Sequence, residues 1–321
     1  MTRQSPEPML SQQSKTPIAK PTLLDRMLRA YFRSGWRGFI RLWRLSGRDL
    51  RDTLRASTSV GTVLELSPFS YIDSIVLREG YYETEVMEAL VSSLGKGVLW
   101  DIGANIGLHG LSAKHLRPES RVICFEPSVE MLSRLCRNRA INGSDFEIVG
   151  LALSNRAGFQ TLHLGPPGNP GMTTLSPWSE ATYSSSCVVA TARGDELVDH
   201  QLVPPPTVIK LDVEGHELPV LEGLHSTLRL PSLHSVVFED SSDPASGIKV
   251  YLARRALPLS DSFALSTPST AWKILSPAGH NMAVRDRCRE LATRLGGQRD
   301  NFASRQPRYF FLRPISGSSK K

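Results

Sequence analysis

The sequence predicts an α/β protein whose core is a doubly wound, mostly parallel sheet, preceded by a basic helical extension. From about residue 97 to about residue 240, short apolar runs alternate with segments of helical periodicity. The apolar runs are continuous rather than interrupted by polar residues, which is typical of parallel strands buried on both faces. The first run leads directly into an aspartate and a glycine-rich turn, DIGANIG at 101–107.

The predicted elements follow this alternation along the chain. Before the core we expect two strand-like pieces, TVLEL at 62–66 and SIVLREG at 74–80. We expect helices at 83–94, 107–115, 129–142 and 218–224. The main sheet is expected to hold seven strands, at 97–100, 121–127, 146–154, 207–214, 233–240, 262–266 and 309–314. A long detour at 155–206 is expected to add strands at 159–165 and 187–193.

Composition divides the 321 residues into four expected regions. Residues 1–21 are rich in Ser, Gln and Pro and are expected to be a disordered tail, as are residues 316–321. A basic helical extension is expected over 22–60 and the catalytic domain over 61–315. The four cysteines are far apart, and Glu7 and Pro8 lie where a signal peptide would be apolar. We therefore expect a soluble, cytoplasmic protein.

The net positive charge of the chain lies in its first 55 residues. Residues 1–55 hold ten Arg and two Lys but only four acidic residues, so the rest of the chain is nearly neutral. A neutral body argues against nucleic acid as a partner. Nine arginines from Arg26 to Arg55 recur every three or four residues, which predicts one helix side, broken near Gly35, Gly38 and Gly47. This segment is either a lid packed on the domain, which we favour, or a peripheral membrane contact.

The glycine-rich turn predicts a nucleoside-bearing cofactor. In a doubly wound sheet the ligand lies beyond the carboxyl ends of the strands, and glycines let the backbone approach it. Glu126 ends the next strand, where an acid can accept both hydroxyls of a ribose. The dinucleotide pattern GxGxxG lacks its middle glycine here, which disfavours a nicotinamide enzyme and favours S-adenosylmethionine. The cofactor residues in this turn are Asp101, Gly103, Ala104, Asn105 and Gly107.

Five motifs in the chain form a recognisable set: REGYYETE at 78–85, DIGANIG at 101–107, FEP at 125–127, LALSNRAG at 151–158 and IKLDVEGHELPVLEG at 209–223. Together they resemble the motifs of the FkbM-type S-adenosylmethionine-dependent methyltransferases. The resemblance covers about residues 63–239 and implies a Rossmann-like methyltransferase domain. It also implies cofactor contacts from Pro127, Leu153 and Ser154. The sequence departs from the family at Arg193 and Gly194, where a Leu-Asp pair is usual, and this leaves substrate choice open.

Candidate catalytic residues gather at the fourth core strand. Lys210 and Asp212 are two apart on a strand and share a face, and Glu214 and His216 follow in the turn. Methyl transfer to a hydroxyl needs a positioned acceptor and a base. Asp212 is the first choice as base, or as ligand to a divalent metal; His216 is the second, because its ordinary pKa lies near neutrality. Alternatively, Lys210 only pairs with Asp212, Glu214 caps the next helix, and His216 is an exposed helix residue.

The resemblance implies O-methylation of a hydroxyl on a glycan, a glycolipid or a polyketide-type natural product. The acceptor is then a small molecule, a glycan or a lipid-linked molecule. N-methylation of an amino group and non-catalytic binding of the cofactor or a glycan remain alternatives. We expect the acceptor site to be built from the N-terminal segment, the detour at 165–186 and the C-terminal third. Metal dependence and oligomeric state stay open.

Overall fold

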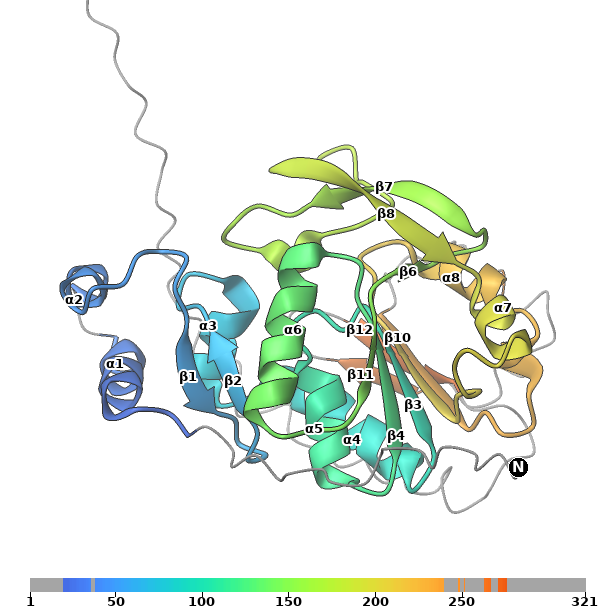
Figure 1. Cartoon of the computed structure of the whole chain (residues 1–321), viewed down its shortest axis with the longest axis horizontal. Coiled ribbons are helices and arrows are strands. Elements are labelled where there is room, and N and C mark those ends of the chain that lie inside the picture. Colours follow the sequence, from blue (N-terminus) through green and yellow to red (C-terminus); the bar gives the residue numbers. More distant parts are fainter. Residues whose placement is uncertain are drawn as a thin grey trace, which may run out of the picture.

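A computed structural model describes residues 20–35, 38–239, 248, 251, 263–266 and 271–275. Its centre is a sheet of seven strands in the order β11-β12-β10-β9-β3-β4-β5 (Figure 1). Their bounds are β3 (Val98–Ile102), β4 (Arg121–Phe125), β5 (Glu147–Val149), β9 (Val208–Leu211), β10 (Ser235–Glu239), β11 (Phe263–Ser266) and β12 (Ala271–Leu275). The five strands from β10 to β5 run parallel, whereas β12 is antiparallel to both of its neighbours. The prediction of an α/β fold with a mostly parallel sheet is confirmed.

The strand order reverses between β3 and β9, because the chain runs outward from β3 to β5 before it returns to β9. Ligands of doubly wound sheets bind at such a reversal, beyond the carboxyl ends of the strands. Alternate side chains of the strands enter two separate cores. Leu99 and Val122 belong to one, and Trp100 and Ile123 belong to the other. Both faces of the sheet are therefore covered, as the continuous apolar runs predict.

Helices pack on both faces. The helices are α1 (Leu23–Arg33), α2 (Phe39–Leu45), α3 (Tyr71–Glu79), α4 (Thr84–Leu94), α5 (Leu108–Leu116), α6 (Val129–Ile141), α7 (Gly194–Asp199) and α8 (Glu217–Gly223), with short 3₁₀ turns at η1 (Pro170–Met172) and η2 (Thr227–Arg229). The predicted helices at 83–94, 107–115, 129–142 and 218–224 correspond to α4, α5, α6 and α8. No helix of the described residues is long and apolar enough to cross a bilayer.

Two smaller sheets complete the described structure. A hairpin of β1 (Leu54–Ser57) and β2 (Val63–Leu66) lies between α1 and α6 (Figure 1). A second sheet, in the order β6-β8-β7, is made by β6 (Ala152–Leu153), β7 (Gly158–Leu164) and β8 (Ser185–Ala192). The strands predicted in the detour at 155–206 are β7 and β8. Their hairpin crosses the edge of the main sheet where the carboxyl ends of the strands lie (Figure 1).

Four sequence predictions are corrected. SIVLREG forms most of helix α3 rather than a strand. The run at 146–154 is split between β5 and β6, which belong to different sheets. The extension at 22–60 is not wholly helical, because β1 begins at Leu54 and Arg55 lies on that strand. The seventh strand of the main sheet is β12, which was not predicted. The predicted strand at 309–314, the tail at 316–321 and residues 1–19 of the first tail lie outside the described residues.

Candidate functional site

The glycine-rich turn joins the ends of three strands. Gly103 has a φ of +77°, and a Cβ at this position would lie 1.8 Å from the backbone oxygen of Asp212. Only glycine fits, because the turn both uses the left-handed region and touches the backbone after β9. The N–H groups of Gly103 and Ala104 donate to the backbone oxygen of Phe125, each at 3.0 Å. The sequence therefore folds the turn tightly between β4 and β9.

Glu126 lies beside this turn, at the end of β4. Its Oε2 accepts from the N–H of Asn105 and its Oε1 from the N–H of Ser128, both at 2.8 Å. Asn105 has a φ of +52°, a conformation that asparagine tolerates better than most residues. Burial raises the pKa of Glu126 to about 7, although the two backbone donors act to lower it. The carboxyl group is thus held rigidly and changes its charge near neutral pH.

A buried ion triad supports the turn from below. Lys210 Nζ lies 3.3 Å from Asp101 Oδ1 and 3.2 Å from Asp212 Oδ2. Burial acts to lower the pKa of Lys210, but the Asp212 and Asp101 carboxylates together raise it. Asp101 is fully buried, and its Oδ2 accepts from the N–H of Gly110 at 2.8 Å in the first turn of α5. A carboxylate at a helix N-terminus is stabilised there by the helix dipole.

A cleft of about 700 Å³ opens at the carboxyl ends of β3, β4 and β9. Its walls are mostly apolar, with a few polar groups. It is lined by Ile72, Ile102, Gly103, Asn105, Phe125, Glu126, Pro127, Met131, Leu151, Ala152, Leu153, Leu162, Pro170, Gly171, Thr173, Thr174, Leu175, Asp212, Val213, Glu214 and His216.

The cleft collects most of the predicted site residues. Of the predicted cofactor residues, Gly103, Asn105, Glu126, Pro127 and Leu153 line it; Asp101, Ala104, Gly107 and Ser154 do not. Asp101 does not line the cleft; it accepts from the N–H of Gly110 in the first turn of α5 instead. Of the predicted catalytic residues, Asp212, Glu214 and His216 line the cleft. Lys210 is 2% exposed and does not line the cleft. It pairs with Asp212, as in the alternative interpretation.

His216 connects three separate segments. Its Nε2 lies 3.0 Å from Ser154 Oγ, after β6, and its Nδ1 lies 2.7 Å from Ser176 Oγ, in the β7–β8 loop. Burial lowers the pKa of His216 to about 4. Burial thus moves the pKa of His216 away from neutrality, and its 6% exposure shows that the alternative of an exposed helix residue is wrong. His216 is a neutral group at physiological pH that ties the loops of the cleft together.

Glu217, rather than Glu214, satisfies the amides of the turn after β9. Its Oε1 accepts from the N–H groups of Val213 and Gly215, both at 3.1 Å. Glu214 has a φ of +55° and faces the cleft, so it does not cap α8. At Gly215, a Cβ would lie 2.8 Å from Trp178 Nε1, which shows how closely the β7–β8 loop covers this turn.

The β7–β8 loop supplies residues of the cleft that were not identified individually from the sequence. Thr173, Thr174 and Leu175 line the cleft, and Ser176 binds His216. The expectation that residues 165–186 contribute to the cleft agrees with this placement. No residue of α1 or α2 lines the cleft, and the N-terminal part of the described chain contributes only Ile72.

A metal site would need a cluster of ligands. Among the residues that the structure describes, no three His, Cys, Asp or Glu side chains are placed to hold an ion. Asp212, the predicted ligand, has Lys210 as its close charged partner, and a cation would have to compete with this ammonium group.

The chain is similar to known methyltransferases. Residues 101–261 match the family described as the methyltransferase FkbM domain. The hexuronic acid methyltransferase AglP of Haloferax volcanii is 32% identical over 175 residues, which cover 54% of this chain and 70% of that protein. The methyltransferase sdnD of Sordaria araneosa is 32% identical over 153 residues, covering 39% of this chain and 59% of sdnD.

Solved structures of other methyltransferases are more distant. The precorrin-6y C5,15-methyltransferase of Geobacter metallireducens GS-15 gives a TM-score of 0.39 at 15% identity, covering 61% of this chain and 88% of that one. A methyltransferase of Agrobacterium tumefaciens gives a TM-score of 0.41 at 10% identity, covering 72% of each chain.

Proposed function

The chain belongs to the FkbM methyltransferase family and is an S-adenosylmethionine-dependent enzyme, and we propose that it methylates a hydroxyl group of a glycan or a similar small molecule. The observation that carries the proposal is that Glu126, after β4, and Asp212, after β9, line the same cleft. The name of the relative AglP, a hexuronic acid methyltransferase, supports a sugar as acceptor.

The residues of the cleft fit S-adenosylmethionine, which supplies a methyl group on a positively charged sulfur. Glu126 is held by two backbone N–H groups and keeps lone pairs free to accept ribose hydroxyls. Gly103 leaves no side chain between the turn and a ligand. Apolar side chains such as Phe125, Met131 and Leu153 suit the face of an adenine ring. Three carboxyl groups line the cleft and attract a cationic ligand.

Asp212 is our proposed base. Its side chain is 27% exposed, so it is reachable from the cleft, while its Oδ2 is anchored by buried Lys210 at 3.2 Å. The anchor fixes the orientation of the carboxylate, which can accept the proton of an acceptor hydroxyl as the oxygen attacks. His216 then acts as a positioning residue, because it joins Ser154 to Ser176 and carries no charge near neutrality.

The charge of the cleft favours acceptors that are neutral at the site of reaction. Among the described lining residues, the ionisable groups are Glu126, Asp212, Glu214 and His216, and none is Lys or Arg. A carboxylate acceptor would face repulsion from the first three. For a hexuronic acid, the favoured product is therefore a methyl ether at a hydroxyl rather than a methyl ester.

N-methylation of an amino group is the second candidate. The same three carboxyl groups would attract a protonated amine, and Asp212 could remove its proton. Non-catalytic binding of the cofactor or a glycan has less support, because the proposed base Asp212 lines the cleft.

A panel of acceptors tests the proposal. The enzyme is incubated with S-adenosylmethionine and with simple glycosides of a neutral hexose, a hexuronic acid or a hexosamine. We expect release of S-adenosylhomocysteine with the first two and, by NMR, a new O-methyl signal. An N-methyl signal on the hexosamine alone would replace the proposal with the second candidate. Binding of the cofactor with no product from any glycoside would contradict a sugar acceptor.

A further inference from the structure

Helices α1 and α2 use only part of their apolar surface to pack on the domain. Leu28 of α1 and Trp43 of α2 are 1% and 0% exposed. Phe32 and Phe39 pack against the same core, and the rings of Phe39 and Trp43 lie 5.7 Å apart between centroids. These residues pack on the domain, whereas other apolar side chains of α1 and α2 do not. The opposite sides of both helices face away from the domain, at one end of the molecule (Figure 1).

Large apolar side chains are concentrated on those outward sides. Fourteen large hydrophobic residues are exposed in the described chain, and six of them lie in α1 and α2. Leu45 is 76% exposed, Leu23 74% and Met27 62%, and the other three are Leu24, Ile40 and Leu42. We call these six residues the α1–α2 surface. Such a concentration is uncommon on a surface that only meets water.

Exposed basic side chains lie on the same two helices and shortly after α2. Arg26, Arg33, Arg41, Arg44 and Arg51 are exposed, and no carboxylate of the described residues forms an ion pair with them. Two other described arginines of the segment have partners. Arg29 donates to the backbone oxygens of Leu77 and Ser57, and Arg48 pairs with buried Asp25 at 2.7 Å.

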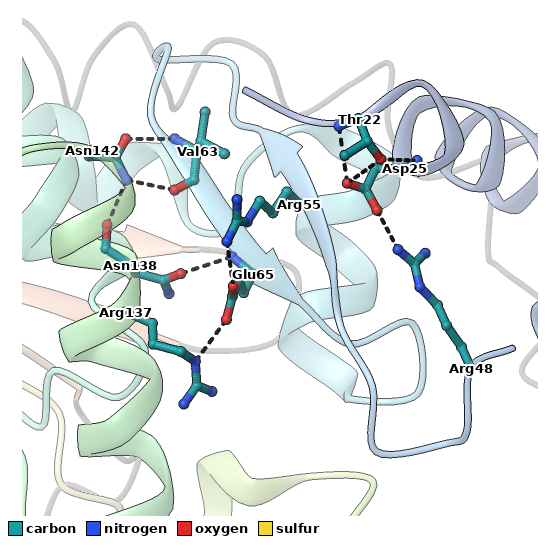
Figure 2. A network of polar contacts seen from close by, with 9 residues as sticks. All are labelled: Thr22, Asp25, Arg48, Arg55, Val63, Glu65, Arg137, Asn138 and Asn142. Atoms are coloured by element: carbon teal, nitrogen blue, oxygen red, sulfur yellow. Dashed lines mark hydrogen bonds and ion pairs between the residues drawn. The ribbon is translucent and has the colours of Figure 1, made fainter. Parts of the chain in front are cut away.

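Polar contacts hold the segment together and join the neighbouring β1–β2 hairpin to the region of α6 (Figure 2). Asp25 forms a capping box with Thr22 at the start of α1 and holds Arg48, which follows α2. The β1–β2 hairpin below it is fixed to α6, because Glu65 pairs with both Arg55 and Arg137. Asn138 of α6 and Asn142, just after α6, also bond to the backbone of β2. The exposed side chains therefore lie on a fixed support.

We propose that the α1–α2 surface binds an anionic lipid bilayer. Apolar side chains, together with arginines that pair with no carboxylate of the described residues, match the interior and the headgroups of such a membrane, and helices of this kind lie in its plane. A purely apolar partner would leave the arginines without counter-charges. Helix α3 connects this surface to the cleft, since it packs on α1 and supplies Ile72 to the cleft wall. The surface can thus present the cleft to acceptors at a membrane, whatever their identity.

Vesicle co-sedimentation of the full chain tests the proposal, with two matched pairs of variants. Leu45→Glu is compared with Phe159→Glu on β7, because these residues are 76% and 78% exposed. Arg44→Gln is compared with Arg156→Gln, since both arginines are exposed. Vesicles are made of phosphatidylcholine alone or mixed with phosphatidylglycerol.

We expect the wild type to pellet with anionic vesicles and to stay in solution with neutral ones. Leu45→Glu should weaken binding by about tenfold or more, and Arg44→Gln by about fivefold, while Phe159→Glu and Arg156→Gln bind as the wild type does. Equal melting temperatures show that the variants remain folded. The proposal would be overturned if the wild type did not bind anionic vesicles, or if the two variants of each matched pair bound them equally. A dimer by light scattering that Leu45→Glu dissociates, without vesicle binding, would assign the surface to a second copy instead.

Discussion

The ammonium nitrogen of Lys210 lies 3.2 Å from Oδ2 of Asp212, although Lys210 is almost fully buried and Asp212 faces the cleft. The two residues lie on either side of Leu211, the last residue of β9. Lys210 also lies 3.3 Å from Asp101, at the next strand of the sheet. The interior of the protein therefore fixes the orientation of the carboxylate that we propose as base.

Lys210→Met should destabilise the protein strongly, by about 3–5 kcal/mol, because it leaves the carboxylate of Asp101 buried without its cation. The free energy of unfolding in urea measures this. The double variant Asp101→Asn, Lys210→Met should recover a large part of the loss, since no buried charge remains. A Lys210→Met variant as stable as the wild type would show that the triad does not hold the end of β9.

Asp212→Asn keeps the shape of the side chain and removes its charge. If Asp212 accepts the proton of the acceptor, kcat should fall by about 10²-fold or more while cofactor affinity changes little. Steady-state kinetics and cofactor titration measure the two effects separately. A chelator should leave the wild-type rate unchanged, because Lys210 already holds this carboxylate. Near-normal turnover in Asp212→Asn would transfer the role to His216 or leave positioning alone.

His216 should make stability depend on pH in the mildly acidic range. Burial lowers its pKa from 6.5 to about 4, so between these values the unfolded chain binds more protons than the folded one. The free energy of unfolding contributed by His216 is therefore fully present above about pH 6.5 and is lost as the pH falls towards about 4. Urea unfolding at several pH values should show this decline in the difference between the wild type and His216→Gln, because Glu126 gives the opposite trend in the same pH range and is common to both proteins. A difference that does not change with pH would contradict a buried neutral imidazole.

Glu126 should couple cofactor binding to pH. Its pKa of about 7 means that the carboxyl group loses its proton as the pH rises through neutrality, and the ionised form accepts ribose hydroxyls more strongly. The affinity for S-adenosylhomocysteine should thus increase from slightly acidic to slightly alkaline pH. Folding shows the opposite trend, because the unfolded chain ionises first and stability falls as the pH rises from 4.5 to about 7. Glu126→Gln should abolish the pH dependence of cofactor affinity and remove the Glu126 contribution to stability, as titrations and melting curves at several pH values can show.

The elements that surround the turn at 101–107 were predictable because their signals are local. A continuous apolar strand, glycines at a tight turn and an acid after the next strand all lie within short stretches of sequence. The same local signals placed Glu126 and Asp212 at the carboxyl ends of β4 and β9. SIVLREG was misassigned since a short apolar run with β-branched residues is compatible with a strand or a helix.

The remaining features depend on contacts between distant segments. The bond between His216 and Ser176 joins residues 40 apart in the chain, and nothing in the local pattern of either residue indicates it. The run at 146–154 divides where β5 leaves the main sheet and β6 joins another, although its apolar pattern continues across the break. Burial also lowers the pKa of His216, whose ordinary value near neutrality had suggested a base.

Isothermal titration with S-adenosylhomocysteine tests the central claim most directly, because it asks whether the cleft holds the cofactor through Glu126. The account predicts binding of the wild type in the micromolar range and no binding of NAD. Glu126→Gln should bind at least about tenfold more weakly, since it loses charged hydrogen bonds to the ribose. Equal affinity of the wild type and Glu126→Gln for S-adenosylhomocysteine would contradict the account.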